Sequence, residues 1–140
     1  MNLARGIRRL HAALVIGVIL VGATFLFLLR VQGHPLGGGG GPLIGYVTAG
    51  LALMNLSVVL GFLRPRMPQR RMDQSPDDYW QTNEARGAAI VIWAMTEGAG
   101  LLAWVGYLLT GGIVPAAVGA LSIGALIMLR PSGLEGDGTA

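Results

Sequence analysis

The stretch from Ala88 to Thr110 constrains the fold more than any other part of the chain, because it is apolar or small over almost its whole length and carries one charged residue, Glu97. At about 1.5 Å per residue, a helix of this length crosses the roughly 30 Å hydrocarbon core of a membrane. An ionised carboxylate near the centre of such a span costs about 2.5–3.5 kcal/mol on insertion scales. We therefore expect Glu97 to be protonated or partnered, and it is the first candidate for a functional site.

The composition agrees with a membrane protein: the chain is 53% hydrophobic and only 12% charged, with a mean hydropathy of +0.61. These values are typical of polytopic membrane proteins. The fold predicted is all-α, a single bundle of four transmembrane helices in two hairpins. The spans are expected at residues 10–29, 43–63, 88–110 and 113–129, with a cytoplasmic loop at 64–87 and a disordered tail at 131–140.

The arginines indicate the orientation of the bundle, and the chain contains no lysine. All of them except Arg30 fall on one side of the predicted membrane: Arg5, Arg8, Arg9, Arg64, Arg66, Arg70, Arg71, Arg86 and Arg130. Basic residues concentrate on the cytoplasmic side, so both termini are expected to be cytoplasmic, in the inner (cytoplasmic) membrane of a cell. Because the arginines flank apolar runs instead of forming one patch, the lipid bilayer is the expected partner and nucleic acid is not.

The segments that connect the predicted spans also predict local structure. The glycine-rich segment at 31–42 predicts a flexible connector, since glycine loses much backbone entropy on ordering. Ser75 followed by Pro76 and two acids is typical of a helix start, so the third span is expected to belong to a longer helix beginning near Pro76. Tyr79 and Trp80 would then lie at the level of the lipid headgroups.

Counting residues from the span centres places Asn55, Glu97 and Ser122 at one depth, on three different helices. We expect these three residues to form a polar anchor or a proton-binding site. Hydrogen bonds between membrane helices contribute about 0.6–2 kcal/mol each. Three roles stay open for Glu97: a protonated contact between helices or subunits, a reversible proton site, and a counter-charge for a substrate or ion.

Small residues predict where helices pack closely. Around Glu97, the residues Trp93, Gly100 and Trp104 share its helical face, and Ala94 with Gly98 forms a small-xxx-small pair on the neighbouring face. In the fourth span a second stripe recurs at every fourth residue, namely Ala116, Ala120 and Gly124. These two sets are the predicted packing interfaces, and they favour a homo-oligomer or a larger membrane complex.

The segment IVIWAMTEGAGLLAWVGYLL resembles the carboxylate-bearing helix of rotary ATP synthase proteolipids, subunit c, in which a Glu lies between small residues. The resemblance implies that Glu97 binds a proton. The chain also shares four spans and one intramembrane Glu with small multidrug resistance transporters, although those carry the Glu in the first span. Here a longer polar loop and two further spans accompany the proteolipid-like helix.

The chain lacks the residues that disulfide bonds, metal sites and common catalytic sets require. The chain has no cysteine, and its two histidines, His11 and His34, lie on opposite sides of the predicted membrane. No metal site, cofactor or catalytic set is expected, so the chain is not predicted to be an enzyme. The preferred interpretation is a non-catalytic helical-bundle subunit or accessory protein with Glu97 as an interhelical polar anchor. The alternatives are a proteolipid-like proton-binding subunit and a four-span transporter of small molecules or ions.

Overall fold

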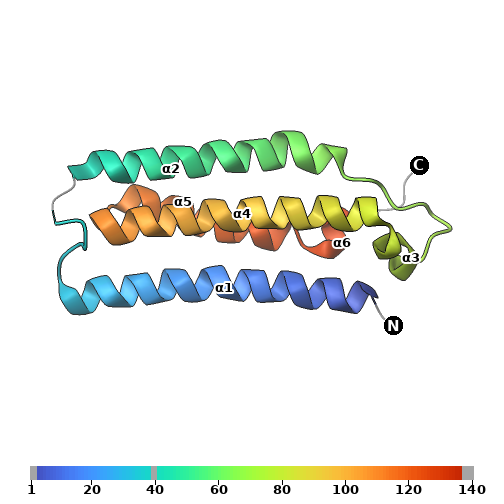
Figure 1. The fold of residues 1–140 in the computed structure, drawn as a ribbon, viewed down its shortest axis with the longest axis horizontal. Coiled ribbons are helices and arrows are strands. Elements are labelled where there is room, and N and C mark those ends of the chain that lie inside the picture. The colour runs from blue at the N-terminus through green and yellow to red at the C-terminus, as the bar shows by residue number, and fades with distance from the viewer. Residues whose placement is uncertain (1–2, 39–40, 137–140) are drawn as a thin grey trace.

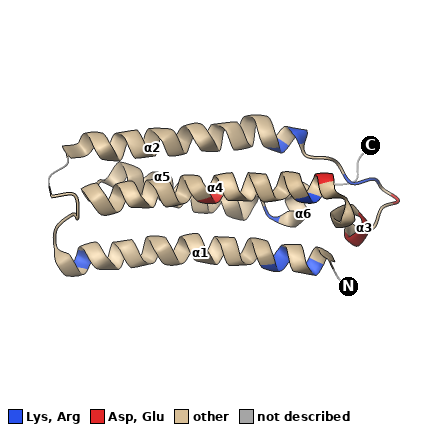
Figure 2. Cartoon of the chain, viewed as in Figure 1, with Lys and Arg blue, Asp and Glu red and all other residues tan. Residues whose placement is uncertain are grey.

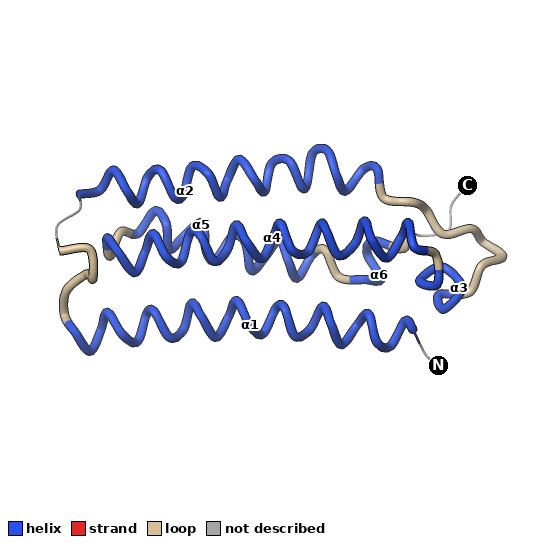
Figure 3. Tube along the Cα trace, viewed as in Figure 1, coloured by secondary structure: helices blue, strands red, loops and turns tan. Residues whose placement is uncertain are grey.

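The computed structural model describes residues 3–38 and 41–136, which are helical apart from short connections (Figures 1 and 3). The α-helices are α1 (Leu3–Gln32), α2 (Gly41–Val58), α3 (Pro76–Gln81), α4 (Asn83–Thr110), α5 (Ile113–Met128) and α6 (Pro131–Leu134). No strand occurs in this part of the chain, so the all-α prediction is confirmed for it. Three helical segments are long and apolar enough to cross a membrane, namely 3–32, 41–66 and 83–110, and α5 is a shorter apolar helix.

Helix α4 is the centre of the bundle. It packs against α1, α2 and α5, and Figure 1 shows it running between α1 and α2 with α5 behind it. Although α1 and α2 follow each other in the chain, they lie on opposite sides of α4. Only α4 and α5 therefore form a packed hairpin, whereas the first of the two predicted hairpins is held open by α4.

Glycines allow the helices to approach Trp104 of α4 closely. A Cβ added to Gly22 of α1 would lie 2.6 Å from a Trp104 ring atom, and one added to Gly119 of α5 would lie 2.7 Å away. Trp104 is 5% exposed, so its indole fills the space between these two glycines. Dense packing of this kind leaves no room for even one methyl group.

The glycine-rich connector is tied to the end of α4 as far as it is described. The N–H groups of Leu36 and Gly37 donate to the carbonyls of Leu108 and Leu109 at 3.2 and 3.1 Å. These carbonyls have no partner within their own helix, since they belong to its last turn. Two backbone hydrogen bonds thus join the connector to α4, and its predicted flexibility stays a prediction. Gly39 and Gly40 lie outside the described residues.

The arginine-rich end of α2 changes its helical pitch. A π-helical turn (η1, Val59–Leu63) and a 3₁₀ turn (η2, Arg64–Arg66) follow α2, and the N–H of Arg64 donates to the carbonyl of Val59. Pro65 explains the change, because its ring lacks an N–H and collides with the carbonyl four residues earlier in a regular α-helix. The two turns let the chain pass Pro65 without a sharp kink.

The predicted long helix from Pro76 into the third span is wrong, because the chain breaks at Thr82. Thr82 has an extended backbone (φ −67°, ψ 127°), and its hydroxyl donates to the carbonyl of Tyr79 at 2.7 Å. Threonine side chains compete in this way with the helical hydrogen-bond ladder. The predicted start is confirmed, since Ser75 Oγ accepts a hydrogen bond from the N–H of Asp78 at 3.1 Å.

The segments at the arginine-rich end form a compact cap on the bundle. Tyr79 and Trp80 are 2% and 0% exposed, so their side chains are buried inside the cap, and their predicted depth at the level of the lipid headgroups stays a prediction. Their polar atoms bond within the protein: Tyr79 Oη donates to the Pro68 carbonyl at 2.6 Å, and Trp80 Nε1 donates to Glu135 Oε1 at 2.8 Å. The tail predicted to be disordered instead forms α6 and contributes Glu135 to the cap, and residues 137–140 lie outside the described part.

Candidate functional site

Glu97 lies on the side of α4 that faces α1. Its side chain is half-buried, and a Cβ added to Gly17 of α1 would lie 4.0 Å from Glu97 Oε1. In Figure 2 the acidic colour in the middle of α4 is far from the charged ends of the bundle. A glycine opposite the carboxyl group leaves space beside it, which a larger side chain at position 17 would reduce.

No side chain or backbone group among the described residues makes a hydrogen bond to the Glu97 carboxyl group. Asn55 donates from Nδ2 to the Met95 carbonyl at 3.1 Å, and its Oδ1 is buried without a donor in the described part of the chain. Ser122 donates to the Val118 carbonyl of its own helix at 2.9 Å. Burying an ionised carboxyl group costs more free energy than burying an amide or a hydroxyl. Of these three side chains, Glu97 is thus the one with the highest cost of burial and the one to which the described residues offer no hydrogen bond.

The three predicted polar residues share a depth but not a direction. Asn55 reaches α4 at Met95, within two residues of Glu97, and Ser122 packs on Gly100, where an added Cβ would lie 3.2 Å from Ser122 Cβ. Met95 is two residues before Glu97 and therefore points to a different side of α4, whereas Gly100 lies on the side that Glu97 shares, where an added Cβ would lie 3.1 Å from Val18 of α1. No hydrogen bond among the described residues links Glu97 to Asn55 or to Ser122. The structure does not join Asn55, Glu97 and Ser122 into one site.

The two small-residue sets differ in how the chain uses them. Ala94 and Gly98 are exposed on α4, and a Cβ at Gly98 would meet nothing within 4 Å. In α5, Ala116 packs against the core, while Ala120 and Gly124 are exposed. Within residues 3–38 and 41–136, no other helix covers Ala94 with Gly98 or Ala120 with Gly124.

Two contacts of aromatic side chains near the arginine-rich end of the bundle were not predicted from the sequence. His11 Nε2 lies 2.8 Å from the Leu126 carbonyl, and Trp93 Nε1 donates to the Leu129 carbonyl at 2.7 Å. The two rings also touch, with centroids 5.1 Å apart. They bind carbonyls near the end of α5 that its own ladder leaves incomplete. In the sequence, these contacts are indicated only by side chains with ring N–H groups that lie in or beside apolar segments.

Glu135 is the charged centre of the cap and was also not predicted from the sequence, since it lies in a short, glycine-rich C-terminal segment with no recognisable motif. Its Oε2 lies 3.7 Å from Arg70 Nη1, and its backbone carbonyl accepts from the Arg70 N–H at 3.1 Å. Burial raises the pKa of Tyr79 to about 12, and the negative charge of Glu135 adds to this effect. These contacts hold three segments of the cap together and do not resemble a reaction centre.

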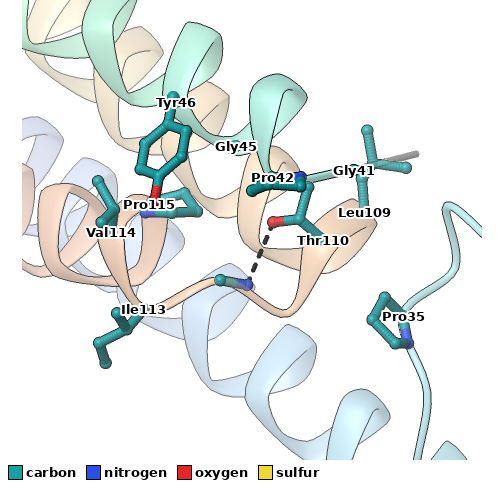
Figure 4. A pocket seen from close by; sticks show the side chains of 11 residues that line it. Pro35, Gly41, Pro42, Gly45, Tyr46, Leu109, Thr110, Ile113, Val114 and Pro115 are labelled. Carbon is teal, nitrogen blue, oxygen red and sulfur yellow. Dashed lines mark hydrogen bonds between the residues drawn. The ribbon is translucent and has the colours of Figure 1, made fainter. Parts of the chain in front are cut away.

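A pocket of about 410 Å³ opens at the end of the bundle opposite the arginine-rich cap (Figure 4). Its lining residues come from the glycine-rich connector and from the ends of α2, α4 and α5: Pro35, Gly41, Pro42, Gly45, Tyr46, Leu109, Thr110, Gly112, Ile113, Val114 and Pro115. Thr110 Oγ1 accepts from the Gly112 N–H at 3.1 Å, so its hydroxyl is used in closing the turn. No acidic or basic side chain lines this pocket.

Metal binding has no support in the part of the chain that the structure describes, where no three His, Cys, Asp or Glu residues cluster. Comparison of the chain with known protein families, with curated proteins and with solved structures finds no match. The features of the chain that bear on its function are therefore Glu97, its neighbours and the uncovered small-residue faces.

Proposed function

We propose that this chain is a non-catalytic, multi-pass protein of the cytoplasmic membrane, with both termini in the cytoplasm, that assembles with a second copy of itself through α4. The observation that supports this most is Glu97, a half-buried carboxyl group to which the described residues offer no hydrogen bond. Beside it, Ala94 and Gly98 leave the backbone of α4 open. A polar group at mid-membrane next to an open backbone is suited to contact with another helix.

A second copy fits this surface better than an unrelated helix. All copies have the same orientation in the membrane, so their α4 helices would run parallel, which is the arrangement that small-xxx-small pairs favour. In a two-fold pair each surface meets its own counterpart. The Glu97 edge of one α4 would then lie beside the α2 edge of the other, where Asn55 occupies the same depth.

The test measures the dissociation constant of the dimer for three variants in liposomes, by energy transfer between labelled copies. Glu97→Gln should leave the constant nearly unchanged, because Gln still donates and accepts hydrogen bonds. Glu97→Leu should weaken the dimer by about 3- to 30-fold, the equivalent of about 0.6–2 kcal/mol for one interhelical hydrogen bond. Gly98→Leu should weaken it as well, since the new side chain keeps the two backbones apart.

The matched control for Gly98→Leu is Gly50→Leu, which places the same side chain in open space on α2. It should not change dimerisation. A wild-type chain that is monomeric at all densities, or that co-purifies with a different protein in equal amounts, would refute the second copy as the occupant. Unchanged dimers of both Glu97→Leu and Gly98→Leu would show that this face of α4 lies against lipid.

The exposure of Glu97 also favours a second candidate function, a reversible proton site. Its carboxyl group is half-buried and not held by a hydrogen bond, so it is accessible to reagents dissolved in the lipid. A hydrophobic carbodiimide modifies protonated carboxyl groups in such surroundings, and Glu97→Gln is the control for the labelled position. Labelling that falls as the pH is raised through the neutral range would support proton exchange. Labelling that does not vary with pH would favour the permanently protonated contact.

A further inference from the structure

Two adjoining hollows on the α2–α5 side of the bundle have opposite chemistry. The first, which we call the inner slot, has a volume of about 570 Å³ and is lined by residues between Leu53 and Arg64 on one side and between Ala120 and Leu129 on the other. The second, the head hollow, has a volume of about 310 Å³ and lies between the end of α2 and the α6 segment. Leu60 and Arg64 line both of them, so the two hollows adjoin at these residues.

The inner slot is apolar and has a floor of small residues. Ala120 and Gly124 form part of the α5 wall, and a Cβ at Gly124 would meet nothing within 4 Å. Leucines line most of the opposite wall, where Ser57 donates its hydroxyl to the Leu53 carbonyl at 2.8 Å and Arg64 lies at the end. An apolar groove with one wall of small residues, whose charged side chain is at its end, suits a hydrocarbon chain.

The head hollow is polar and lacks negative charge. Gln69, Gly133 and Gly136 line it together with Arg64, and no acidic side chain lines either hollow. Arg64 is exposed, and no carboxylate of the described residues lies within salt-bridge distance of it. Its neighbour Arg66 is used differently, since its guanidinium carbon lies 3.4 Å from the centroid of the Phe62 ring. Arg64 is thus a cation positioned for an anionic group such as a phosphate.

The length of the inner slot corresponds to one leaflet. At about 1.5 Å per residue, the stretch from Leu53 to Arg64 covers about 16 Å, close to half of a hydrocarbon core of about 30 Å. The slot begins near the level of Asn55 and Glu97 and ends at the arginine-rich end of the bundle (Figure 2). An acyl chain in the slot would therefore bring its headgroup to Arg64.

We propose that the inner slot and the head hollow bind one anionic phospholipid of the cytoplasmic leaflet, with an acyl chain along Ala120 and Gly124 and its phosphate on Arg64. This inference rests on the membrane orientation proposed above, but not on dimerisation through α4. The π-helical and 3₁₀ turns around Pro65 carry Arg64 at the junction of the two hollows. Irregular helical turns of this kind often occur at binding sites.

The test uses native mass spectrometry of the full chain, purified in mild detergent and titrated with phosphatidylglycerol or with phosphatidylcholine of the same acyl chains. The wild-type protein should retain one phosphatidylglycerol per chain and bind it more tightly than phosphatidylcholine. Arg64→Gln should weaken phosphatidylglycerol binding by about fivefold, the equivalent of about 1 kcal/mol for one basic residue at an anionic surface. It should weaken phosphatidylcholine binding less, because the choline ammonium of that headgroup offsets the charge of the phosphate.

Two matched controls separate the site from general effects. Arg66→Gln removes the same charge from the same end of the bundle and should not change lipid binding. Ala120→Leu fills the slot and should reduce the binding of both lipids, whereas Ala13→Leu adds the same side chain to an exposed position of α1 and should not. Circular dichroism checks that each variant is folded, and Arg64→Gln still tests the proposal if Ala120→Leu does not fold.

Equal losses of phosphatidylglycerol in Arg64→Gln and Arg66→Gln would overturn the proposal, because the attraction would then be a property of the whole basic end. A change of oligomeric mass in Ala120→Leu without loss of lipid would also overturn it, since a helix of another chain would then occupy the slot. Lipid loss in Arg64→Gln together with a monomeric Gly98→Leu would support both proposals. Lipid loss alongside an unaltered Gly98→Leu dimer would support the lipid site and refute the α4 contact.

Discussion

At the scale of single residues, Trp104 shows how the bundle obtains its close packing. Its ring takes the volume that side chains at Gly22 and Gly119 would occupy. Glycine in a helix costs about 1 kcal/mol relative to alanine, yet here the large ring compensates by filling the gap between three helices. Trp104 Nε1 is buried without an acceptor among the described residues, so packing and not hydrogen bonding holds it.

We predict that Gly22→Ala lowers the melting temperature of the protein in detergent. The new Cβ would lie 2.6 Å from the Trp104 ring, and overpacking of this kind costs about 1–3 kcal/mol. Gly50→Ala is the control, because its Cβ would meet open space and alanine is the better helix former. Thermal unfolding followed by circular dichroism measures both variants. Equal melting temperatures would show that Trp104 can move aside.

At the scale of elements, the cap depends on α6 being joined to α3 by Glu135. The carboxylate accepts from Trp80 and lies near Arg70, while the backbone of the same residue accepts from the Arg70 N–H. Glu135 is 6% exposed, so its charge must be satisfied inside the cap. A helix as short as α6 is stable only through such contacts.

We predict that Glu135→Ala destabilises the cap by about 1–3 kcal/mol, since it leaves the Trp80 N–H buried without an acceptor. Faster protease cleavage in the 67–75 segment and a lower melting temperature would report this loss. Asp73→Ala, which removes an acid from an exposed part of the same end, should have no effect. Glu135→Gln retains an acceptor for Trp80 and should lie between the two. An Ala variant as resistant as wild type would show that α6 is held by Leu134 alone.

At the scale of the whole molecule, the distribution of charge gives the bundle two unlike ends. Arg30 is the arginine of one end, whereas all the others lie at the end that carries the cap (Figure 2). By the positive-inside rule, we expect the capped end to lie in the cytoplasm. The chain has no cysteine, so single cysteines can report the side of the membrane without a background.

We predict that His34→Cys reacts with a membrane-impermeant maleimide in right-side-out vesicles, whereas Asp73→Cys reacts only after the vesicles are opened. Both positions are exposed, so lack of reaction reports the membrane and not burial. Labelling of Asp73→Cys in sealed vesicles would reverse the orientation. Labelling of both positions from outside would rule out a membrane-spanning connection between them.

The sequence alone was sufficient to locate the apolar helices and the charges at their ends, but not α6. The apolar runs, the start at Ser75, the arginine bias and the single acid of the third run are properties of contiguous segments. Each can be recognised without knowing what the segment touches. The shared depth of Asn55 and Glu97 also followed from counting residues, because helical rise is constant. The same local rules failed at Thr82, where a side-chain hydrogen bond ended α3.

Only the tertiary structure decided which way each helix faces and which distant segments meet. The rotation of α4 between α1 and α2 turned Glu97 toward Gly17 and away from Asn55 and Ser122. The cap depends on Trp80 and Glu135, which are 55 residues apart in the chain. The inner slot likewise exists only where α2 and α5 lie side by side. Such features arise from the combined packing of several helices, and no single segment of the sequence contains the information that specifies them.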